Sequence, residues 1–254
     1  MKNSLINVNQ RRDFIFNLLL KHKYVEVKDI AAKCKVSELT IRRDLEFFEH
    51  KSLIERYYGG ARLIEDSSAD QKSHQLNITK EAIAKTAAKY IDSGDTIFIN
   101  TSSTALLVIK YLNTKQVTII TNSTKALTMN NNPNATIILS GGEVYPKKDS
   151  MVGDFALNNL TKIHVSKSIL GCSALSLNEG LTTSIHSEVS LNQTMLKNTK
   201  GLRIIALDSS KINKVASYVT ASLSDIDMII TDKKANHEDI EKIKQKYLIK
   251  VILV

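Results

Sequence analysis

Two adjacent arginines, Arg42 and Arg43, follow shortly after Ser37 and Thr40. Arginine can donate two parallel hydrogen bonds to guanine or bind phosphate, and serine and threonine can each reach phosphate or a base edge. These residue types, on the first turns of one helix, suit contact with the major groove of DNA. An ordinary exposed helix could have the same composition, so the flanking segments decide between the two interpretations.

A helix-turn-helix must position these side chains. Ser37 is a good N-cap, and the residues after it are typical of a helix to about Glu49. At 100° per residue, one face of that helix is apolar and would pack in a core, through Ile41, Leu45 and Phe48. Residues 27–34 predict a second helix, and Lys35 and Val36 form the turn between the two.

The segment after the helix that begins at Ser37 predicts a wing. Residues 53–62 read as a strand, a Gly-Gly turn and a basic exit, which is the hairpin that a winged helix lays along the phosphate backbone. Arg56, Tyr58 and Arg62 are therefore the expected wing contacts. Upstream, residues 11–21 predict a helix that packs behind the motif through Phe14, Ile15, Leu18 and Leu19. Residues 1–10 have no apolar period and are expected to be flexible.

The rest of the chain predicts an α/β domain. Helices are expected at 80–91, 105–112, 186–197 and 238–246, and buried strands at 96–99, 117–120, 136–139, 168–170, 203–206, 228–230 and 251–254. Nearly continuous apolar strands that alternate with helices indicate a mostly parallel sheet covered on both faces.

Polar loops follow the first three of these strands, and loops at the carboxyl ends of parallel strands form ligand sites. The hydroxyls, amides and glycines in them could surround an anion at the start of a helix. Any one loop could be an ordinary N-cap or turn, but three together favour an anion pocket. The candidate residues are Asn100, Thr101, Ser102, Ser103, Thr104, Thr121, Asn122, Ser123, Gly141 and Gly142.

The composition is that of a globular chain long enough for two domains: 254 residues, 43% hydrophobic and 24% charged. We expect a DNA-binding domain at 1–63, a polar linker at 64–79 and an effector-sensing and oligomerisation domain at 80–254.

The net charge of +9 suits a polyanionic partner, and residues 1–63 carry 13 Lys and Arg against 8 Asp and Glu. No segment predicts a membrane span or secretory leader, so we expect a cytoplasmic protein. The spacing of Cys34, Cys172 and the histidines indicates no disulfide and no metal or other cofactor.

The residues from Val36 to Leu45, followed by Tyr58-Gly59-Gly60-Ala61, resemble the winged-helix signature of the DeoR/GlpR family of bacterial transcriptional regulators. Two positions depart from that pattern. Lys35 stands where the family usually has glycine, and Tyr58 stands where it commonly has histidine. A lysine in a left-handed turn costs about 1 kcal/mol and adds a charge near the DNA.

The C-terminal part is similar to the sensor domain of the same regulators, which resembles ribose-5-phosphate isomerase in fold and binds phosphorylated sugars or their relatives. The resemblance adds Glu188, Asp208 and Lys211 to the candidate effector site, with Lys211 as the cation for a phosphate or sugar acid. Four positions depart from the pattern: Asn100 replaces aspartate, Ser102 glycine, Lys72 arginine and Asn192 lysine. The serine could crowd a phosphate, and Asn100 supplies no charged acceptor.

Three functions are compatible with these features. The first is a DNA-binding regulator, a repressor of a sugar-utilisation operon, whose partners are double-stranded operator DNA, a phosphorylated sugar and further copies of itself in a dimer or tetramer. The second is an isomerase-like enzyme in which Glu188 and Asp208 move a proton. The third is a DNA-binding oligomer that has lost its ligand. A winged helix favours a regulator over an enzyme.

Overall fold

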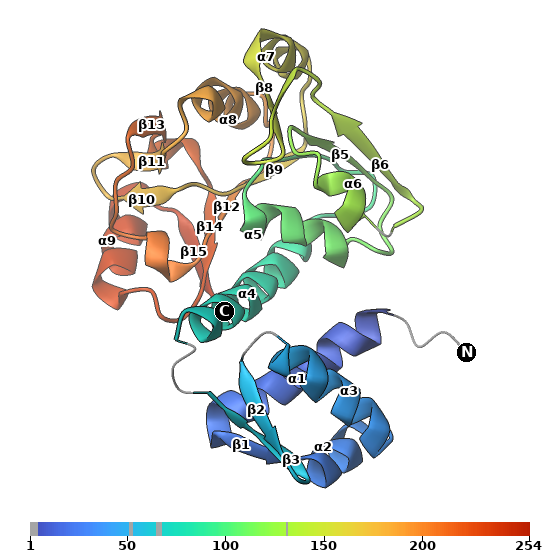
Figure 1. The fold of residues 1–254 in the computed structure, drawn as a ribbon. Coiled ribbons are helices and arrows are strands. Elements are labelled where there is room, and N and C mark those ends of the chain that lie inside the picture. The colour runs from blue at the N-terminus through green and yellow to red at the C-terminus, as the bar shows by residue number, and fades with distance from the viewer. Residues whose placement is uncertain (1–4, 51–52, 65–67, 131) are drawn as a thin grey trace. The chain divides into compact units, whose positions relative to one another are not determined.

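The computed structural model describes residues 5–50, 53–64, 68–130 and 132–254. The chain divides into two compact units, Met1–Ile78 and Thr79–Val254, and Figure 1 shows both. Each unit has apolar cores of its own, so each is described by itself.

The first unit packs helices against a small antiparallel sheet. Its elements are α1 (Leu5–His22), β1 (Tyr24–Glu26), α2 (Val27–Cys34), α3 (Glu38–Glu49), β2 (Ile54–Tyr57) and β3 (Gly60–Leu63). The strand order is β1-β3-β2, so β3 pairs on both sides. The apolar face predicted for α3 at Ile41, Leu45 and Phe48 is buried in the core. The helix-turn-helix and the hairpin are both present as predicted.

Two predictions for the first helix are wrong. The helix α1 begins at Leu5, so residues 5–10 are helical, where a flexible start was expected. Phe14 is 41% exposed, whereas Phe16 is fully buried. The buried face of α1 is centred between Ile15 and Phe16, and Phe14 points away from it.

The second unit is organised around a seven-stranded sheet of order β15-β14-β12-β9-β4-β5-β6, in which every pairing is parallel. Its strands are β4 (Thr96–Ile99), β5 (Val117–Thr121), β6 (Ala135–Leu139), β9 (Lys167–Leu170), β12 (Arg203–Ala206), β14 (Met228–Thr231) and β15 (Lys250–Leu253). They correspond to the seven predicted strands. The α/β class with a mostly parallel sheet is therefore confirmed.

Helices cover both faces of this sheet. Alternate residues of a strand point to opposite faces, so Ile97 and Phe98 belong to two different cores. One core contains α5 (Ser103–Leu106), the 3₁₀ helix η1 (Leu107–Tyr111), α6 (Ala126–Met129) and the end of α4 (Ser68–Ala88). The other contains α7 (Gly153–Thr161), α8 (Val189–Lys197) and α9 (His237–Tyr247).

Two small antiparallel sheets were not predicted. One is the hairpin of β7 (Glu143–Tyr145) and β8 (Ser150–Val152), and the other has the order β10-β11-β13, from β10 (Ala174–Ser176), β11 (Gly180–Thr183) and β13 (Tyr218–Ala221). Short 3₁₀ helices complete the unit: η2 (His186–Glu188), η3 (Ser209–Lys211) and η4 (Leu223–Asp225). These loops and short strands bring distant segments to the carboxyl edge of the large sheet.

The segment expected to be a linker, residues 64–79, is helical from Ser68 onward. The helix α4 runs without a break to Ala88, where a helix from Lys80 to Ile91 was expected. The segment from Ser68 to Thr79 contains no proline or glycine, and polar residues such as Gln and Lys are good helix formers. A polar composition alone therefore did not indicate an irregular chain. Residues 65–67 lie outside the described residues.

Candidate DNA-binding surface and effector pocket

Ser37 defines the beginning of α3. Its side chain accepts a hydrogen bond from the backbone N–H of Thr40 at 3.2 Å, and the two hydroxyl oxygens lie 2.9 Å apart. In the turn before it, Lys35 has the left-handed conformation expected there, with φ 54° and ψ 44°. The first turn of α3, which carries the candidate DNA contacts, is therefore held in place by its cap.

A buried carboxylate anchors α3 to α1. Asp44 is 2% exposed, and its two oxygens accept hydrogen bonds from the Nε atoms of Arg11 at 2.5 Å and Arg12 at 2.9 Å. The guanidinium of Arg12 also stacks 3.8 Å from the centre of the Phe47 ring. This cluster was not predicted from the sequence, because an aspartate on a helix usually indicates a solvated face. The cluster sets the orientation of the outward-facing arginines.

The predicted DNA-contacting arginines differ in their partners. Three form ion pairs with glutamates: Arg42 with Glu38 at 3.6 Å, Arg56 with Glu49 at 2.7 Å and Arg62 with Glu55 at 2.7 Å. Exposed pairs of this kind are weak, so a phosphate could displace the glutamate. Arg43 is exposed and has no ion pair within the described residues. Of the four, Arg43 is thus the most readily available to a base or a phosphate.

The wing presents an aromatic side chain at its tip. Tyr58 is fully exposed, and Gly59 beside it has φ +86°, a conformation that favours glycine. A side chain at Gly60 would lie 2.4 Å from the carbonyl oxygen of Val25, so only glycine fits between β1 and β2. Between α3 and this hairpin the surface is hollowed by about 620 Å³, with Lys28, Arg42 and Arg56 among its lining residues.

A polar pocket of about 390 Å³ lies at the carboxyl edge of the second unit. Loops that follow four neighbouring strands, β12, β9, β4 and β5, contribute to its wall. Of the predicted effector residues, it contains Asn100, Thr101, Ser102, Ser103, Glu188 and Lys211. Residues not predicted complete it: Lys125, Lys148, Gly171, Cys172, Ser173, Leu181, Thr183, Ile185, Asn192 and Thr220. The sequence offered no signal for the two additional lysines, which are ordinary loop residues by composition.

Asn100 is a structural crosslink in this wall. It is 3% exposed, and its Nδ2 donates to the carbonyl oxygen of Gly171 at 2.9 Å and to Oδ1 of Asn192 at 3.1 Å. Its Oδ1 accepts from the N–H groups of Gly171 at 3.0 Å and Ser102 at 3.3 Å. The side chain has therefore used its donors and acceptors within the protein. It shapes the loop after β4 and leaves ligand contact to its neighbours.

Ser102 fits because it faces a glycine. A Cβ atom at Gly171 would lie 2.0 Å from the Ser102 hydroxyl oxygen and 2.5 Å from its Cβ atom. The Ser102 hydroxyl is buried and has no hydrogen-bond partner within the described residues. An unsatisfied buried hydroxyl costs about 1–3 kcal/mol, and a ligand oxygen in the pocket would relieve that cost. Ser102 is thus a candidate ligand contact, which answers the concern that it would only crowd one.

Charged groups in the pocket are held at set positions. The Glu188 carboxylate accepts hydrogen bonds from the hydroxyls of Thr101 at 2.9 Å and Thr183 at 3.2 Å. The Lys211 ammonium donates to the carbonyl oxygen of Cys172 at 3.0 Å. Burial raises the pKa of the Cys172 thiol to about 12, so that thiol is protonated at neutral pH.

A second lysine lies near Lys211. Burial lowers the pKa of Lys80, and the neighbouring Lys211 ammonium lowers it further, whereas the Asp208 carboxylate raises it. Two ammonium groups close enough to repel each other favour an anion between or beside them. Lys80 lies outside the pocket wall itself, so its effect on a ligand is electrostatic.

Seven predicted effector residues do not line the pocket: Thr104, Thr121, Asn122, Ser123, Gly141, Gly142 and Asp208. Thr121, at the end of β5, and Asn122 and Ser123 after it are buried, and the last two contact the β7–β8 hairpin. Asn122 donates to the carbonyl oxygen of Met151 at 3.3 Å, and Ser123 donates to that of Asp149 at 3.5 Å. They therefore position the turn that carries Lys148. The prediction that they line the pocket is wrong, and their role in it is indirect.

The remaining four lie among the protein's own atoms, and the hydroxyl of Thr104 is buried without a hydrogen-bond partner within the described residues. A Cβ atom at Gly142 would lie 2.5 Å from the carbonyl oxygen of Val152, so the close approach there is to the protein's own backbone. Thr104 is fully buried, and the Asp208 carboxylate is buried and accepts from the hydroxyl of Ser210. Gly141 has φ +70° and faces the Asn159 side chain, whose Nδ2 donates to the carbonyl oxygen of Ser140.

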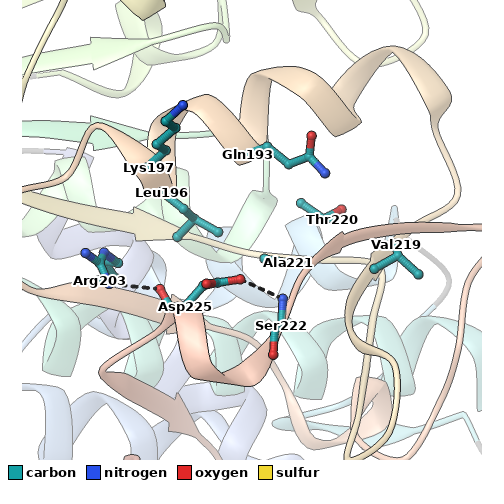
Figure 2. Close-up of a pocket in the computed structure, with 9 residues that line it drawn as sticks. All are labelled: Gln193, Leu196, Lys197, Arg203, Val219, Thr220, Ala221, Ser222 and Asp225. Carbon is teal, nitrogen blue, oxygen red and sulfur yellow. Dashed lines mark hydrogen bonds between the residues drawn. The ribbon is translucent and has the colours of Figure 1, made fainter.

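A second hollow, of about 620 Å³, lies between α8, β13 and η4, and Figure 2 shows the side chains that line it. Arg203 donates to the backbone oxygen of Asp225 there at 3.4 Å, and the Asp225 carboxylate accepts from the N–H of Ser222 at 2.9 Å. None of the predicted effector residues lines it. Thr220 lines both hollows, so they share a wall.

No group of three or more His, Cys, Asp and Glu side chains within the described residues is placed to hold a metal ion. In the same part of the chain, no helix is both long and apolar enough to cross a membrane. A winged helix-turn-helix with exposed arginines, followed by a parallel α/β unit with a cationic pocket, defines a ligand-sensing transcription regulator.

Comparison with known proteins identifies the family. Residues 11–67 match the DeoR-like helix-turn-helix domain, and residues 77–233 match the DeoR C-terminal sensor domain. The chain belongs to the DeoR family of transcriptional regulators. It is 31% identical to the HTH-type transcriptional regulator YulB of Bacillus subtilis, with 94% of each chain covered. It is 30% identical to the glycerol-3-phosphate regulon repressor of Escherichia coli, covering 88% of this chain and 90% of that one.

Among solved structures, ribose 5-phosphate isomerase A of Methanocaldococcus jannaschii is similar over 52% of this chain and 53% of its own, with 18% identity and a TM-score of 0.38. The curated relatives are transcriptional regulators. The protein is accordingly a DNA-binding regulator, and the isomerase-like alternative built on Glu188 and Asp208 is set aside.

Proposed function

We propose that the protein is a repressor of a sugar-utilisation operon and that a phosphorylated sugar metabolite, bound in the pocket of the second unit, releases it from double-stranded operator DNA. It acts in the cytoplasm as a homo-oligomer, a dimer or a tetramer. The observation that carries this proposal is the joint presence, in one chain, of the exposed Arg43 on α3 and of the pocket that contains Glu188 and Lys211.

The DNA-binding role rests on the first unit. Arg43 and Arg42 project from the first turns of α3, which are the turns that enter the major groove in helix-turn-helix proteins. Arg56, Arg62 and the exposed Tyr58 belong to the wing, where contacts to the phosphate backbone fix the register without reading sequence. Ser37 and Thr40 hold the helix start and have hydroxyls near the same surface.

The effector role rests on the chemistry of the pocket. Lys211 supplies a positive charge for a phosphate, and the Ser102 hydroxyl has no hydrogen-bond partner among the described residues. The Glu188 carboxylate, held by Thr101 and Thr183, can accept hydrogen bonds from sugar hydroxyls. This combination suits a polyhydroxy compound with an anionic group. The names of relatives such as the glycerol-3-phosphate regulon repressor support an effector of this kind.

The oligomer follows from operator recognition. One winged helix reads only a few base pairs, whereas two copies that bind half-sites about 34–36 Å apart on one face of the duplex can discriminate an operator. A protein that sediments as a monomer and protects one short half-site at saturating DNA would contradict this part of the proposal.

A mobility-shift assay with DNA from upstream of the protein's own gene and neighbouring genes tests the function. We expect a retarded complex that is released by at least one member of a panel of phosphorylated sugars and by none of the unphosphorylated sugars. A complex that no member of the panel affects would support the ligand-independent regulator instead. If the protein, with its folding verified by circular dichroism, bound none of this DNA, the result would contradict the proposal that it regulates these genes.

A further inference from the structure

The pocket has positive charge at both ends. Its floor is formed by the loops after β12, β9, β4 and β5, which lie side by side in that order. Lys211 follows β12 at one end, and Lys125 follows β5 at the other. Neighbouring parallel strands are about 4.8 Å apart, so the ends of β12 and β5 are separated by about 14 Å. The two lysines therefore belong to loops at opposite ends of this row of four strands.

The lysine end formed by the β5 loop and the β7–β8 hairpin has two cations. Lys125 and Lys148 both line the pocket. The ammonium of Lys125 lies 3.0 Å from the Asp149 carboxylate, but both side chains are about half exposed, so this pair is weak and exchangeable. Lys148 is exposed and has no ion pair within the described residues. This end can accept an anionic group without breaking a buried interaction.

Among the described residues that line the pocket, the wall between the two ends has no further cation. It contains the hydroxyls of Thr101, Ser102 and Thr183, together with the Glu188 carboxylate. A carboxylate repels a phosphate placed beside it but accepts hydrogen bonds from hydroxyl groups. Anionic groups of a ligand are thus directed to the two ends, and hydroxyl groups to the middle.

We propose, on the basis of the function proposed above, that the preferred effector has two anionic groups, one at each end of a polyhydroxy chain. A sugar bisphosphate and a phosphorylated sugar acid share this chemistry. The first group binds at Lys211 and the second at Lys125 and Lys148. A sugar monophosphate fills only one end, and it therefore binds more weakly.

Isothermal titration of the full-length protein tests this inference. The probes are fructose 1,6-bisphosphate, 6-phosphogluconate and, as the compound with one anionic group, fructose 6-phosphate. We expect one of the first two to bind about tenfold more tightly than fructose 6-phosphate, which is the gain from one additional charge-assisted contact. A preference for the bisphosphate or for the sugar acid shows which second group the protein selects.

Three lysine variants locate the two groups. Lys148→Ala should weaken binding of the compound with two anionic groups about tenfold and leave fructose 6-phosphate within twofold of wild type. Lys211→Ala should weaken both. Lys162→Ala, at an exposed position after α7, removes the same charge outside the pocket and should change neither. A thermal melt of each variant verifies that it is folded.

The outcomes separate this inference from the function on which it rests. Equal affinity for the compounds with one and with two anionic groups, or an equal effect of Lys148→Ala on both, would overturn the two-group effector but leave a phosphosugar sensor intact. No heat from any of the three probes, together with an operator complex that none of them changes, would count against the sensor function as well.

Discussion

The side-chain amide of Asn100 donates a hydrogen bond to Oδ1 of Asn192 at 3.1 Å. The family pattern has aspartate at the first position and lysine at the second, so the two departures noted in the sequence are in direct contact. A neutral pair stands where an anion and a cation would stand, and the net charge of the pocket wall is the same in both cases. The departures compensate each other, and the wall that Asn100 shapes is intact.

This contact predicts a non-additive double substitution. Asn100→Asp removes the donors to Gly171 and Asn192 and leaves a buried charge, so we expect it to reduce the free energy of unfolding by about 1–3 kcal/mol. Adding Asn192→Lys supplies a cation and should recover part of that loss. Urea denaturation of the wild type, both single variants and the double variant gives the coupling free energy. Simple additivity would show that the two side chains do not interact.

The second prediction concerns the arginines of α3. Arg43→Ala should weaken operator binding by about 1–3 kcal/mol and relax base preference if Arg43 contacts a guanine. Arg42→Ala should also weaken binding, but by less, because Arg42 is shared with Glu38. The assay is a mobility shift with the operator and base-substituted copies, with Lys162→Ala as the control for lost charge. Unchanged affinity and sequence preference in both variants would reject α3 as the recognition helix.

The third prediction concerns Asp44, the buried partner of Arg11 and Arg12. Asp44→Asn should destabilise the first unit by about 3 kcal/mol, because it leaves two guanidinium groups without their carboxylate in a partly desolvated site. Hydrogen exchange of α3 amides measures the local loss of stability. Glu38→Gln, at the exposed partner of Arg42, serves as the control and should change exchange little. Similar exchange in both variants would show that Asp44 does not anchor α3.

The sequence predicts a strand when the strand coincides with a continuous run of apolar residues, and it fails where a short strand lacks such a run. The strands of the parallel sheet are apolar runs. The five inner strands are buried on both faces, and the edge strands β6 and β15 are partly exposed but keep the same apolar composition, so all seven are recognisable. The short strands β10, β11 and β13 have no such pattern, and Leu181 pairs with Ala221, forty positions away in the chain. That pairing depends on tertiary packing, which local sequence does not record.

The same difference between local signals and tertiary packing explains which residues of the candidate pocket were predicted from the sequence. Thr101, Ser102 and Ser103 were predicted because they follow a strand and precede a helix, which is a local signal. Lys125 and Lys148 were missed, since a loop lysine has the same local signal whether it faces solvent or a ligand. Asn122 and Ser123 were assigned to the pocket for the same local reason as Thr101, but the β7–β8 hairpin covers them.

The fourth prediction is a pH dependence. Burial alone would raise the pKa of Asp95, but hydrogen bonds from Lys167, the backbone of Asp92 and Ser166 lower it below its ordinary value of 3.8. Burial alone would lower the pKa of Lys167, but its contacts with Asp92 and Asp95 raise it above 10.5. The contribution of Asp95 to stability is therefore present above pH 3.8 and is lost as the pH falls through its lower folded pKa. That of Lys167 is lost as the pH rises through its higher folded pKa.

Lys167→Met should accordingly lower the free energy of unfolding by about 1 kcal/mol at pH 7. The difference from wild type should shrink at acid pH, where Asp95 is protonated, and again at strongly alkaline pH, where Lys167 is neutral. Urea denaturation at pH 2, 4, 7 and 12 measures this difference between the variant and the wild type. A constant difference across this range would show that packing of the Lys167 side chain, and not its charge, accounts for the effect.

The last prediction concerns the coupling of ligand to DNA. An effector shifts the operator equilibrium only by its different affinities for the DNA-bound and free states of the protein. With a coupling of about 1–3 kcal/mol, a saturating effector should change the operator dissociation constant about 5- to 150-fold. Lys211→Ala should abolish that response at the same effector concentration and leave operator binding without effector unchanged, because Lys211 belongs to the second unit and lines its pocket. Fluorescence anisotropy of labelled operator, with and without effector, measures both quantities for the wild type, Lys211→Ala and the control Lys162→Ala. If Lys211→Ala weakened operator binding in the absence of effector, Lys211 would act on the structure of the regulator and not through ligand recognition.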